Sequence, residues 1–556
     1  HRLLTHDDEY RQAAQNFADH CAAQDEINSL FQASCAELTP IFGKIQDLLD
    51  LGSAKPSDLF FYIGLTARLL LSAVIQGDRR DTAEFMTGAP RPTDPEDKRE
   101  IWKTCLRHVE QELEKFPVQT DIQKARRSIS DQCRRFADKP GGIYQLNVPT
   151  GAGKTLSSLR YALAHSARWN KSRIIFVSPL LAILEQNSAV IRKYVGNDSV
   201  ILEHHSNLVR TQENPEQMDM RELLTEDWAA PIIITTLAQL LNTLLDGKPA
   251  SIRRFQALSN SVIVLDEVQT VPSKMLTLFN LAVNFLDKVC GATVVLCSAT
   301  QPCFRKTAHP LSVEPIDMVP YDRQLWSAFY RTKIQNGGSM RLEEVTTFAL
   351  RVLEQADSML IVCNKKDEAA YLYRALSGCG SRCYHLSAAM CTAHRRAVLD
   401  DLRSSLQKAK EKTGEKTICV STQVIEAGVD ISFERVIRLS AGMDSVIQSA
   451  GRCNRNGESD TPAPVYLVQC QNENLARLPD IQRGKDATES LLAQYERAPD
   501  RFKGELSSNE AIDFYYQKFY QEMPEGSQDY KVKGKPYSIF SLLSDNGCLA
   551  DERAEA

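Results

Sequence analysis

Two adjacent acids, Asp266 and Glu267, directly follow the apolar run VIVL at 262–265. Four apolar residues in a row predict a buried strand, so the acids stand at its carboxyl end. Upstream, the sequence PTGAGKT at 149–155 follows another strand-like run, IYQLNV. Glycines in such a loop let backbone N–H groups approach phosphate oxygens, and a helix opening after it adds its positive end. Because the carboxyl ends of parallel strands meet at one crevice, the two segments predict a phosphate site beside two carboxylates.

The residues expected to bind the nucleotide in this loop are Thr150, Gly151, Ala152, Gly153, Lys154 and Thr155. Lys154 can reach the β- and γ-phosphates, and the Thr155 hydroxyl can ligate Mg²⁺. Asp266 is expected to hold the same Mg²⁺, usually through water, and Glu267 to polarise the attacking water. The loop departs from the common pattern, which has a glycine where Val148 or Pro149 stands here. Taken singly, the loop also fits an ordinary glycine turn, and the acid pair fits a solvated strand end.

A basic segment, QSAGRCNRNG at 448–457, supplies the other side of the site. Gln448, Arg452 and Arg455 are predicted in a short helical segment, where residues three apart share a face. Arginines so placed are suited to reach across a cleft toward developing phosphate charge. A solvated basic helix end is the alternative. With the phosphate loop, the segment predicts an ATP site split between two lobes, which nucleotide binding closes and release opens.

The elements that must position these residues change in character along the chain. Residues 1–115 show helical spacing, whereas from about residue 140 short β-branched runs alternate with helix-like segments. That alternation predicts α/β folding with two tandem parallel-sheet lobes. The expected domains are a helical segment at 1–115, lobe 1 at 116–315, lobe 2 at 316–480, and a partial helical C-terminal region at 481–556.

Bulk properties describe an ordinary globular protein of 556 residues, 43% hydrophobic, with a net charge of −5. A nucleic-acid partner would therefore have to be held by local patches. No apolar run reaches the roughly 18 residues of a membrane helix, and the best candidate, 60–75, carries Arg68 at its centre. Fifteen scattered cysteines indicate free thiols in a reducing compartment. We therefore expect a cytoplasmic monomer with no membrane partner.

Several motifs together resemble those of superfamily 2 helicases: PTGAGKT, DEVQ, SAT (298–300), STQVIEAGVD (421–430) and QSAGRCNR. Within them, the chain is similar to the helicase-nucleases of type I CRISPR interference, which the Cascade surveillance complex recruits. Supporting segments are SPLLAILEQN (178–187), LEHHSNL (202–208) and YHLSAAM (384–390). The resemblance spans about 120–475. It implies two RecA-like lobes, ATP with Mg²⁺, movement from 3′ to 5′, and single-stranded DNA and a Cascade-type complex as partners.

The resemblance also implies roles for individual residues. Ser298 and Thr300 would couple hydrolysis to lobe movement, Gly428 and Asp430 would lie near the nucleotide's sugar and phosphates, and Gln132 would recognise adenine. The residues that would line the single-strand track are Pro179, Gln186, Thr235, Thr236, His385, Ser387, Ser421 and Thr422. Hydroxyls suit sequence-indifferent phosphate contacts, although each of these residues also fits a turn or a helix cap.

The family's amino-terminal HD nuclease, which uses two metal ions, has only a partial counterpart. Residues 69–86 resemble its last helix, with Asp78 at the closing metal-ligand position, whereas His6-Asp7 lacks the usual following Gly-Lys and fits a polar loop better. A divalent transition metal is therefore expected there only if the missing ligands are supplied. After about residue 480, the chain would begin a linker and accessory domain, also incomplete. FYYQKFY at 514–520 fits either a base-stacking platform or buried helix packing.

The function favoured is that of an ATP-dependent single-stranded DNA translocase and helicase, which unwinds target DNA for an associated HD nuclease. A DExH-type RNA helicase has the same chemistry and stays open. A non-hydrolysing nucleic-acid clamp is disfavoured because Lys154, Glu267 and Arg455 are intact. A simple nuclease is disfavoured by the incomplete metal-ligand set.

Overall fold

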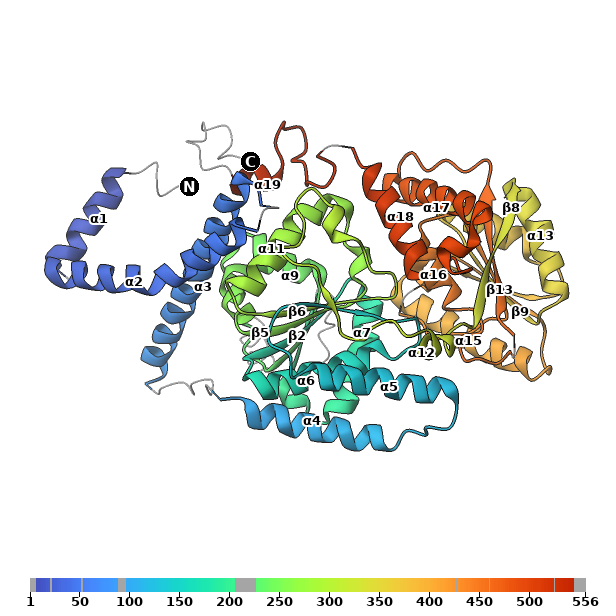
Figure 1. Ribbon diagram of the computed structural model, residues 1–556, viewed down its shortest axis with the longest axis horizontal. Helices are drawn as coiled ribbons and strands as arrows, with labels where there is room; N and C mark the ends of the chain where they lie inside the picture. The colour runs from blue at the N-terminus through green and yellow to red at the C-terminus, as the bar shows by residue number, and fades with distance from the viewer. Residues whose placement is uncertain are drawn as a thin grey trace.

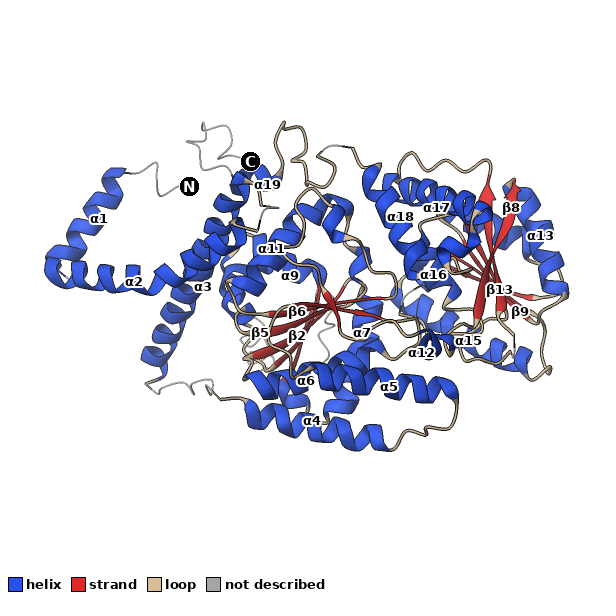
Figure 2. Ribbon diagram, in the orientation of Figure 1, coloured by secondary structure: helices blue, strands red, loops and turns tan. Residues whose placement is uncertain are grey.

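Two parallel β-sheets, each with helices on both faces, form the body of this computed structural model (Figures 1 and 2). The structure describes residues 7–20, 23–51, 54–88, 97–205, 227–426, 428–459, 461–524 and 526–544. The first sheet has the strand order β3-β4-β2-β5-β6-β1-β7, and the second has the order β10-β11-β9-β12-β13-β8. We call the first sheet with its helices lobe 1 and the second sheet with its helices lobe 2. The predicted class, two tandem RecA-like α/β lobes, is confirmed.

The strands are β1 (Ile143–Asn147), β2 (Arg173–Ser178), β3 (Ile201–His204), β4 (Ile232–Thr236), β5 (Ser261–Leu265), β6 (Thr293–Ser298), β7 (Ile316–Asp317), β8 (Thr332–Met340), β9 (Ser358–Val362), β10 (Arg382–Leu386), β11 (Thr417–Ser421), β12 (Arg435–Leu439) and β13 (Ala463–Cys470). The helices are α1 (Asp7–His20), α2 (Gln24–Leu49), α3 (Pro56–Thr87), α4 (Arg99–Glu114), α5 (Asp121–Phe136), α6 (Lys154–Trp169), α7 (Leu181–Val195), α9 (Leu237–Leu245), α10 (Pro249–Arg253), α11 (Leu276–Lys288), α12 (Arg323–Ser327), α13 (Leu342–Glu354), α14 (Lys366–Leu376), α15 (Thr392–Lys410), α16 (Met443–Ala450), α17 (Pro479–Arg497), α18 (Asn509–Gln521) and α19 (Ile539–Ser544).

Alternate residues of the lobe 1 strands pack into two separate cores. On β2, Ile174 and Phe176 lie in the core beneath α4 to α7, whereas Ile175 and Val177 face the core formed with α9 and α11. This two-residue period is what a strand imposes, and burial on both faces explains its uninterrupted apolar sequence. The polar residues of the motifs are thereby pushed to the strand ends.

The division between the sheets falls between Asp317 and Thr332. β7 is only two residues long, yet it pairs with β1 at the edge of the first sheet. The second sheet then begins with β8, which pairs with β13. The segment expected as the start of lobe 2, from residue 316, therefore first completes the lobe 1 sheet.

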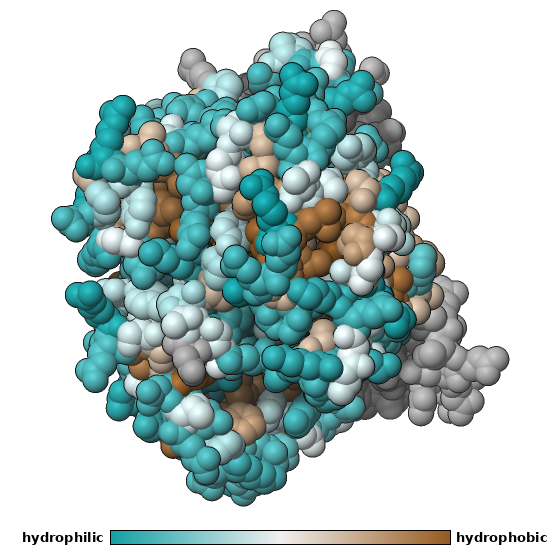
Figure 3. Space-filling view, turned by 90° about the vertical axis from the view of Figure 1, so that its right-hand side faces the viewer, coloured by the Kyte–Doolittle hydropathy of each residue, from teal (hydrophilic) through white to brown (hydrophobic). Residues whose placement is uncertain are grey.

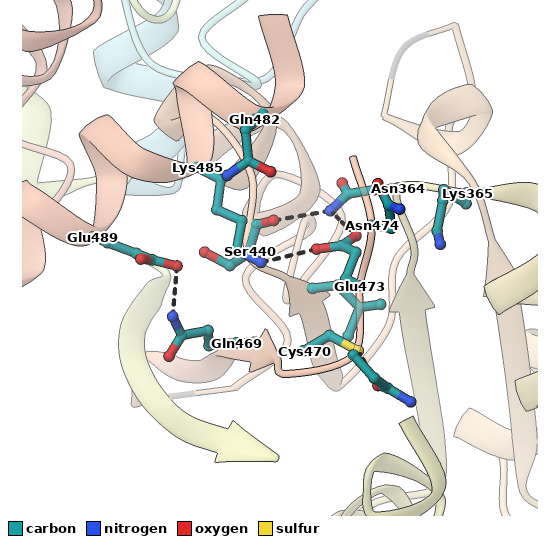
Figure 4. Close-up of polar contacts among 12 residues, drawn as sticks. Asn364, Lys365, Ser440, Gln469, Cys470, Glu473, Asn474, Gln482, Lys485 and Glu489 are labelled. Carbon is teal, nitrogen blue, oxygen red and sulfur yellow. Dashed lines mark hydrogen bonds and ion pairs between the residues drawn. The ribbon is translucent and has the colours of Figure 1, made fainter. Parts of the chain in front are cut away.

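A buried polar cluster fills the carboxyl edge of the lobe 2 sheet between β9 and β12 (Figure 4). The chain leaves these neighbouring strands in opposite directions, a place where open α/β sheets commonly bind ligands. Here Asn364 donates to the Ser440 carbonyl (2.9 Å) and to the Glu473 carboxylate (2.8 Å). Lys485, from α17, pairs with the other Glu473 oxygen at 3.1 Å, and the Glu473 side chain is fully buried. The chain itself thus occupies this crevice.

Replacing Lys485 by methionine is expected to lower the free energy of unfolding by about 3–5 kcal/mol, because Glu473 stays buried without its counter-ion. Urea unfolding followed by circular dichroism would measure the loss. The double variant Lys485→Met/Glu473→Leu should recover most of it, since removing both charges also removes the desolvation cost. A double variant as unstable as the single one would contradict this explanation.

The N-terminal helices α1 to α3 form an arm on lobe 1 (Figure 1). One face of α3 is buried, and Arg68 donates to the carbonyls of Thr243 and Asp246. By length and composition alone, Pro56–Met86 could also cross a membrane, with 33% of its most apolar window buried. The large apolar side chains exposed along this arm are Phe17, Leu30, Phe31, Phe42, Leu51, Phe60, Ile63, Leu70, Leu71, Val74, Phe85 and Met86. By contrast, hydrophilic side chains dominate the lobe 2 end of the molecule (Figure 3).

The last described helices connect the two lobes. Tyr515 of α18 donates to the Asp444 carboxylate of lobe 2 (3.0 Å), and Tyr516 donates to the Thr300 carbonyl of lobe 1 (3.3 Å). Tyr515, Tyr516 and Tyr520 are buried, so the FYYQKFY segment provides helix packing and not an exposed stacking platform. Farther along, Phe540 of α19 packs against α3, which brings the chain back to its N-terminal arm.

Two histidines, His165 and His204, make the stability of lobe 1 depend on pH. His165 contacts the Ala137 carbonyl (3.1 Å) and the Thr293 hydroxyl (3.0 Å), and burial lowers its pKa to about 4. His204 accepts a hydrogen bond from the Trp228 indole (3.0 Å), and its pKa is likewise lowered by burial to about 4. Both rings are therefore neutral in the folded protein where an unfolded histidine is already protonated.

Stability is expected to fall as pH drops from about 6.5 to about 4, by about 1.4 kcal/mol per pH unit for each histidine. The unfolded chain binds the proton in this window and the folded chain does not, whereas above the window both forms are neutral. Urea midpoints measured across the window should show a shallower slope for His165→Gln than for wild type. Equal slopes would show that His165 titrates normally in the folded state.

Candidate active site and nucleic-acid surface

The phosphate-binding loop connects β1 to α6 in the predicted manner. Gly151 and Gly153 adopt positive φ angles of 81° and 87°, which side-chain-bearing residues rarely adopt. Gly153 caps α6, so Lys154 and Thr155 are its first residues. The first turn of a helix presents unpaired N–H groups and a positive dipole end, and both favour a bound phosphate.

The two acids lie directly opposite this loop. Asp266 follows β5, and Glu267 takes a left-handed backbone with φ of 46°, an uncommon conformation for a residue with a side chain. That turn points the Glu267 carboxylate at Lys154, with an ion pair of 3.2 Å. Both side chains of the pair are largely buried, at 13% and 18% exposed. Backbone strain of this kind persists where the surroundings fix it, and here it aims the Glu267 carboxylate at the phosphate loop.

Burial and the lysine set the protonation of the acid pair in opposite directions. Burial raises the pKa of Asp266, and the neighbouring Glu267 charge raises it further. Burial would also raise the pKa of Glu267, but the Lys154 ammonium outweighs it and the net pKa is lowered. Burial disfavours the charged form of Lys154, but the Glu267 and Asp266 carboxylates outweigh this effect and raise the pKa of Lys154. Glu267 is therefore held ionised, as a group that polarises water must be.

Lobe 2 contributes Gln448, which lies on α16 and donates to the Glu267 carboxylate at 3.3 Å. The lobes approach so closely here that a Cβ added to Gly451 would lie 2.9 Å from the Thr150 hydroxyl oxygen. The phosphate loop and acids of lobe 1 therefore face the basic segment of lobe 2 directly.

The prediction that Arg452 and Arg455 share a helix face is wrong. α16 ends at Ala450, because Cys453 forms a β-bridge with Phe433 and the following residue turns into a left-handed conformation. Arg452 is buried and donates to the carbonyls of Ile425 and Glu426, so it ties the end of α16 to the STQVIEAGVD segment. Arg455 instead pairs with Asp430 at 2.7 Å.

Arginines that the motif analysis missed also surround the phosphate loop. Arg126, from α5, donates to the Gly151 carbonyl at 2.7 Å, and Arg331 donates to the Thr150 carbonyl at 3.4 Å. Burial lowers the pKa of Arg331 to about 10, and Arg126 and Arg455 add repulsion. One Arg331 nitrogen, Nη1, is buried with no hydrogen-bond partner among the described residues. The sequence analysis gave neither arginine a role, and the fold places both beside the phosphate loop.

Crowded guanidinium groups beside a loop with two glycines of positive φ fit a polyphosphate. The anion would neutralise the repulsion and supply the acceptor that Arg331 lacks. Mg²⁺, when bound, would neutralise phosphate charge, and Thr155 and Asp266 are placed to hold it. These two residues lie on either side of one buried amide, Asn187. The site residues thus fit ATP and its cation.

Gln132, predicted to recognise adenine, lies on α5 with its amide 3.4 Å from the Ser128 hydroxyl of the same helix. Gly428, predicted near the nucleotide, is pressed against α7, since a Cβ there would lie 2.9 Å from Ala182. The part of α5 that contacts the phosphate loop is Arg126. The nucleotide roles of Gln132 and Gly428 stay predictions.

The predicted coupling residues connect the acid pair to the C-terminal helix. Gln269 donates to the Glu267 carboxylate at 2.6 Å and accepts from the Ser298 hydroxyl at 2.7 Å. Ser298 in turn accepts from the Thr300 backbone N–H at 2.9 Å, and Thr300 accepts from Tyr516. A continuous hydrogen-bonded path therefore leads from the Glu267 carboxylate to α18, through Gln269 and Tyr516, two residues to which the sequence analysis gave no role.

Apart from Gln186, which lies within α7, the residues predicted for the strand track lie at or just after carboxyl ends of strands, and they differ in accessibility. Gln186 is exposed, and Pro179 and His385 are half-buried. Thr235 and Thr236 use their hydroxyls internally, one on the His204 carbonyl and the other as the cap of α9. The remaining members, Ser387, Ser421 and Thr422, are buried. Direct strand contact stays a prediction for this group, and Gln186, Pro179 and His385 are the members that solvent reaches.

Asp78 lies exposed on α3. In the part of the chain that the structure describes, no three His, Cys, Asp or Glu side chains gather as a metal site would require. His6 of the HD dipeptide, and residues 206–208 of the LEHHSNL segment, lie outside the described residues. The transition-metal site at Asp78 stays a prediction.

Two family models match the chain. Residues 131–307 match the model for DEAD/DEAH box helicases, and residues 355–458 match the model for the C-terminal part of the CRISPR-associated nuclease/helicase Cas3. Over both lobes the chain is therefore similar to the Cas3-type helicases of superfamily 2. Both matched regions coincide with the two faces of the candidate site.

Similar proteins include two relatives called CRISPR-associated nuclease/helicase Cas3. That of Methanothermobacter thermautotrophicus is 24% identical over 376 residues, 63% of this chain and 43% of the relative. That of Haloferax volcanii is 24% identical over 530 residues, 76% of this chain and 54% of the relative. The chain therefore spans about half the length of these relatives.

Solved structures share the fold. T. fusca Cas3 with AMPPNP has a TM-score of 0.58 at 17% identity, covering 76% of this chain and 54% of that chain. A chain in a structure described as a CRISPR RNA-guided surveillance complex, pre-nicking, has a TM-score of 0.52 at 17% identity, covering 70% and 50%.

Proposed function

We propose that this chain is an ATP-dependent translocase and helicase that moves along single-stranded DNA, from 3′ to 5′. The observation that carries the proposal is the contact of Gln448 from lobe 2 with Glu267 of lobe 1, which is itself paired with Lys154. A site assembled from two lobes links nucleotide binding to lobe closure, and repeated closure and opening can move a bound strand.

In this proposal each group in the cleft has one task. Lys154 and the arginines bind phosphate charge, Thr155 and Asp266 hold Mg²⁺, and Glu267 takes the proton of the attacking water. Arg455 supplies transition-state charge from lobe 2 once it leaves Asp430. The path through Gln269 and Ser298 reports hydrolysis to Thr300 and α18.

We assign the domains as predicted, with lobe 1 at 116–315 and lobe 2 at 316–480, adjusted so that β7 belongs to lobe 1. Residues 1–115 would be part of an HD-like domain, and 481–556 a linker and the start of an accessory domain. The target is unwound for degradation by an associated HD nuclease. The partner is a Cascade-type complex in the cytoplasm, in line with the surveillance-complex chain of similar fold, and the chain acts as a monomer.

Steady-state ATP hydrolysis with and without matched single-stranded DNA and RNA tests the proposal, beside a Lys154→Ala control. Stimulation by DNA only, lost in the control, is the expected result. Equal or greater stimulation by RNA would favour the RNA-helicase alternative. No hydrolysis under any condition would overturn the motor and favour a nucleic-acid clamp.

A further inference from the structure

Asn187 connects two residues that are expected to hold Mg²⁺ from separate elements. The hydroxyl of Thr155, in the first turn of α6, donates to Asn187 Oδ1 at 3.0 Å. Asn187 Nδ2 donates to Asp266 Oδ2, at the end of β5, at 2.9 Å. Asn187 itself lies on a third element, α7, and is only 8% exposed. One amide thus spans the phosphate loop and the acid pair.

The position of Asn187 within α7 is one where an apolar residue would be ordinary. The buried face of this helix carries Ile183, Leu184, Ile191 and Val195 at helical spacing, and Asn187 falls on the same face. A buried amide costs free energy unless its polar atoms are bonded, and asparagine is also a poor helix former. The two shorter hydrogen bonds of Asn187 are those to Thr155 and Asp266, the two residues expected to hold Mg²⁺. The third contact, to the Ser178 hydroxyl, is longer at 3.3 Å.

The directions of these bonds leave the cation-binding atoms free. Because the Thr155 hydroxyl gives its proton to Asn187, its oxygen keeps its lone pairs for a metal. Asp266 receives Asn187 on one oxygen and the Glu267 backbone N–H on the other, at 3.0 Å. Each carboxylate oxygen has about two acceptor positions, so both oxygens retain one for a cation or its water. A flipped amide would set two oxygens against each other at Asp266.

We propose that Asn187 is a positioning residue for Mg²⁺, which orients the Thr155 hydroxyl and the Asp266 carboxylate before the cation arrives. The inference rests on the proposed ATPase function and deepens it. Partners that orient metal ligands commonly change metal affinity by about 10–100-fold when removed. Asn187 therefore determines how strongly Mg²⁺ and nucleotide reinforce each other, without touching either.

The experiment compares wild type with Asn187→Leu, which keeps the branched shape of the side chain and loses its hydrogen bonds to Thr155, Asp266 and Ser178. ADP binding is measured by isothermal titration calorimetry at saturating MgCl₂ and again in EDTA. The ratio of the two affinities is the coupling between Mg²⁺ and nucleotide. Lys193→Ala is the matched control, because Lys193 is exposed on the same helix. Thermal unfolding checks the fold, and Asn187→Ala takes its place if the leucine variant does not fold.

We expect the coupling ratio of Asn187→Leu to fall by about 10–100-fold, with ADP affinity in EDTA changed by less than about threefold. Lys193→Ala should match wild type. In an Asp266→Asn background the leucine substitution should add little, because its effect passes through that carboxylate.

A wild-type ratio in the variant, or equal losses with and without Mg²⁺, would overturn the positioning role and leave the proposed function standing. A wild-type chain that binds no ADP under either condition would instead overturn the proposed function, and the inference with it.

Discussion

Replacing Glu267 by glutamine is expected to lower the rate of ATP hydrolysis by about 10²–10⁴-fold while ADP affinity changes little. The substitution keeps the shape of the side chain and removes its ability to take a proton. Lys154 and Gln448, which contact this carboxylate, remain to bind phosphate and to join the lobes. The loss should therefore fall on turnover and not on binding.

Single-turnover hydrolysis and nucleotide titration separate these two effects. Glu343→Gln is a suitable control, since Glu343 is an exposed acid on α13, far along the chain from the cleft. Loss of nucleotide binding equal to the loss of turnover would show that Glu267 acts mainly as the counter-ion of Lys154.

Arg455→Ala is expected to lower turnover by about 10³-fold or more, the usual contribution of an arginine that stabilises transferring phosphate. In this structure the guanidinium is held by Asp430, whose own side chain is 72% exposed. A carboxylate this exposed is strongly screened by water, so the ion pair contributes little stability and Arg455 can leave it for a developing phosphate charge. Arg455→Lys should recover only part of the rate, because a lysine lacks the planar fork.

Arg351→Ala provides the control, as an exposed arginine on α13. Asp430→Asn distinguishes two explanations: it should leave turnover within about threefold of wild type if Arg455 acts on phosphate. A loss in Asp430→Asn as large as in Arg455→Ala would show that the pair itself, and not the free guanidinium, is what hydrolysis needs.

The central strands and the phosphate loop could be predicted because their signals are local. A strand buried on both faces of a parallel sheet is an uninterrupted run of apolar residues, so the sequence alone predicts β2, β5 and β6. β8 is not visible, since TKIQNGGSM is a half-exposed edge strand with two glycines and a bulge. The two-residue β7 carries too little pattern to detect.

Residues that act through distant contacts left weaker signals. The sequence does show Asn187 as a polar residue on the apolar face of a helix. It does not show that its partners are Thr155 and Asp266, which lie far from it in the chain. In the sequence, nothing distinguishes Arg126 and Arg331 from other arginines, and only the folded chain places them beside the phosphate loop. The helix predicted through Arg455 failed because a long-range bridge between Phe433 and Cys453 ends it early.

Gly451 has no side chain, and this determines which measurement would detect a substitution at this position. The closed cleft places Thr150 where any side chain at residue 451 would stand, with a Cβ 2.9 Å from its hydroxyl oxygen. A larger residue there would press mainly on Thr150 of lobe 1 and so act as a spacer between the lobes. We therefore expect such a substitution to leave the thermal unfolding midpoint nearly unchanged and to lower the rate of ATP hydrolysis. Which residues are tolerated at position 451 would then depend on lobe closure and not on the folding of either lobe.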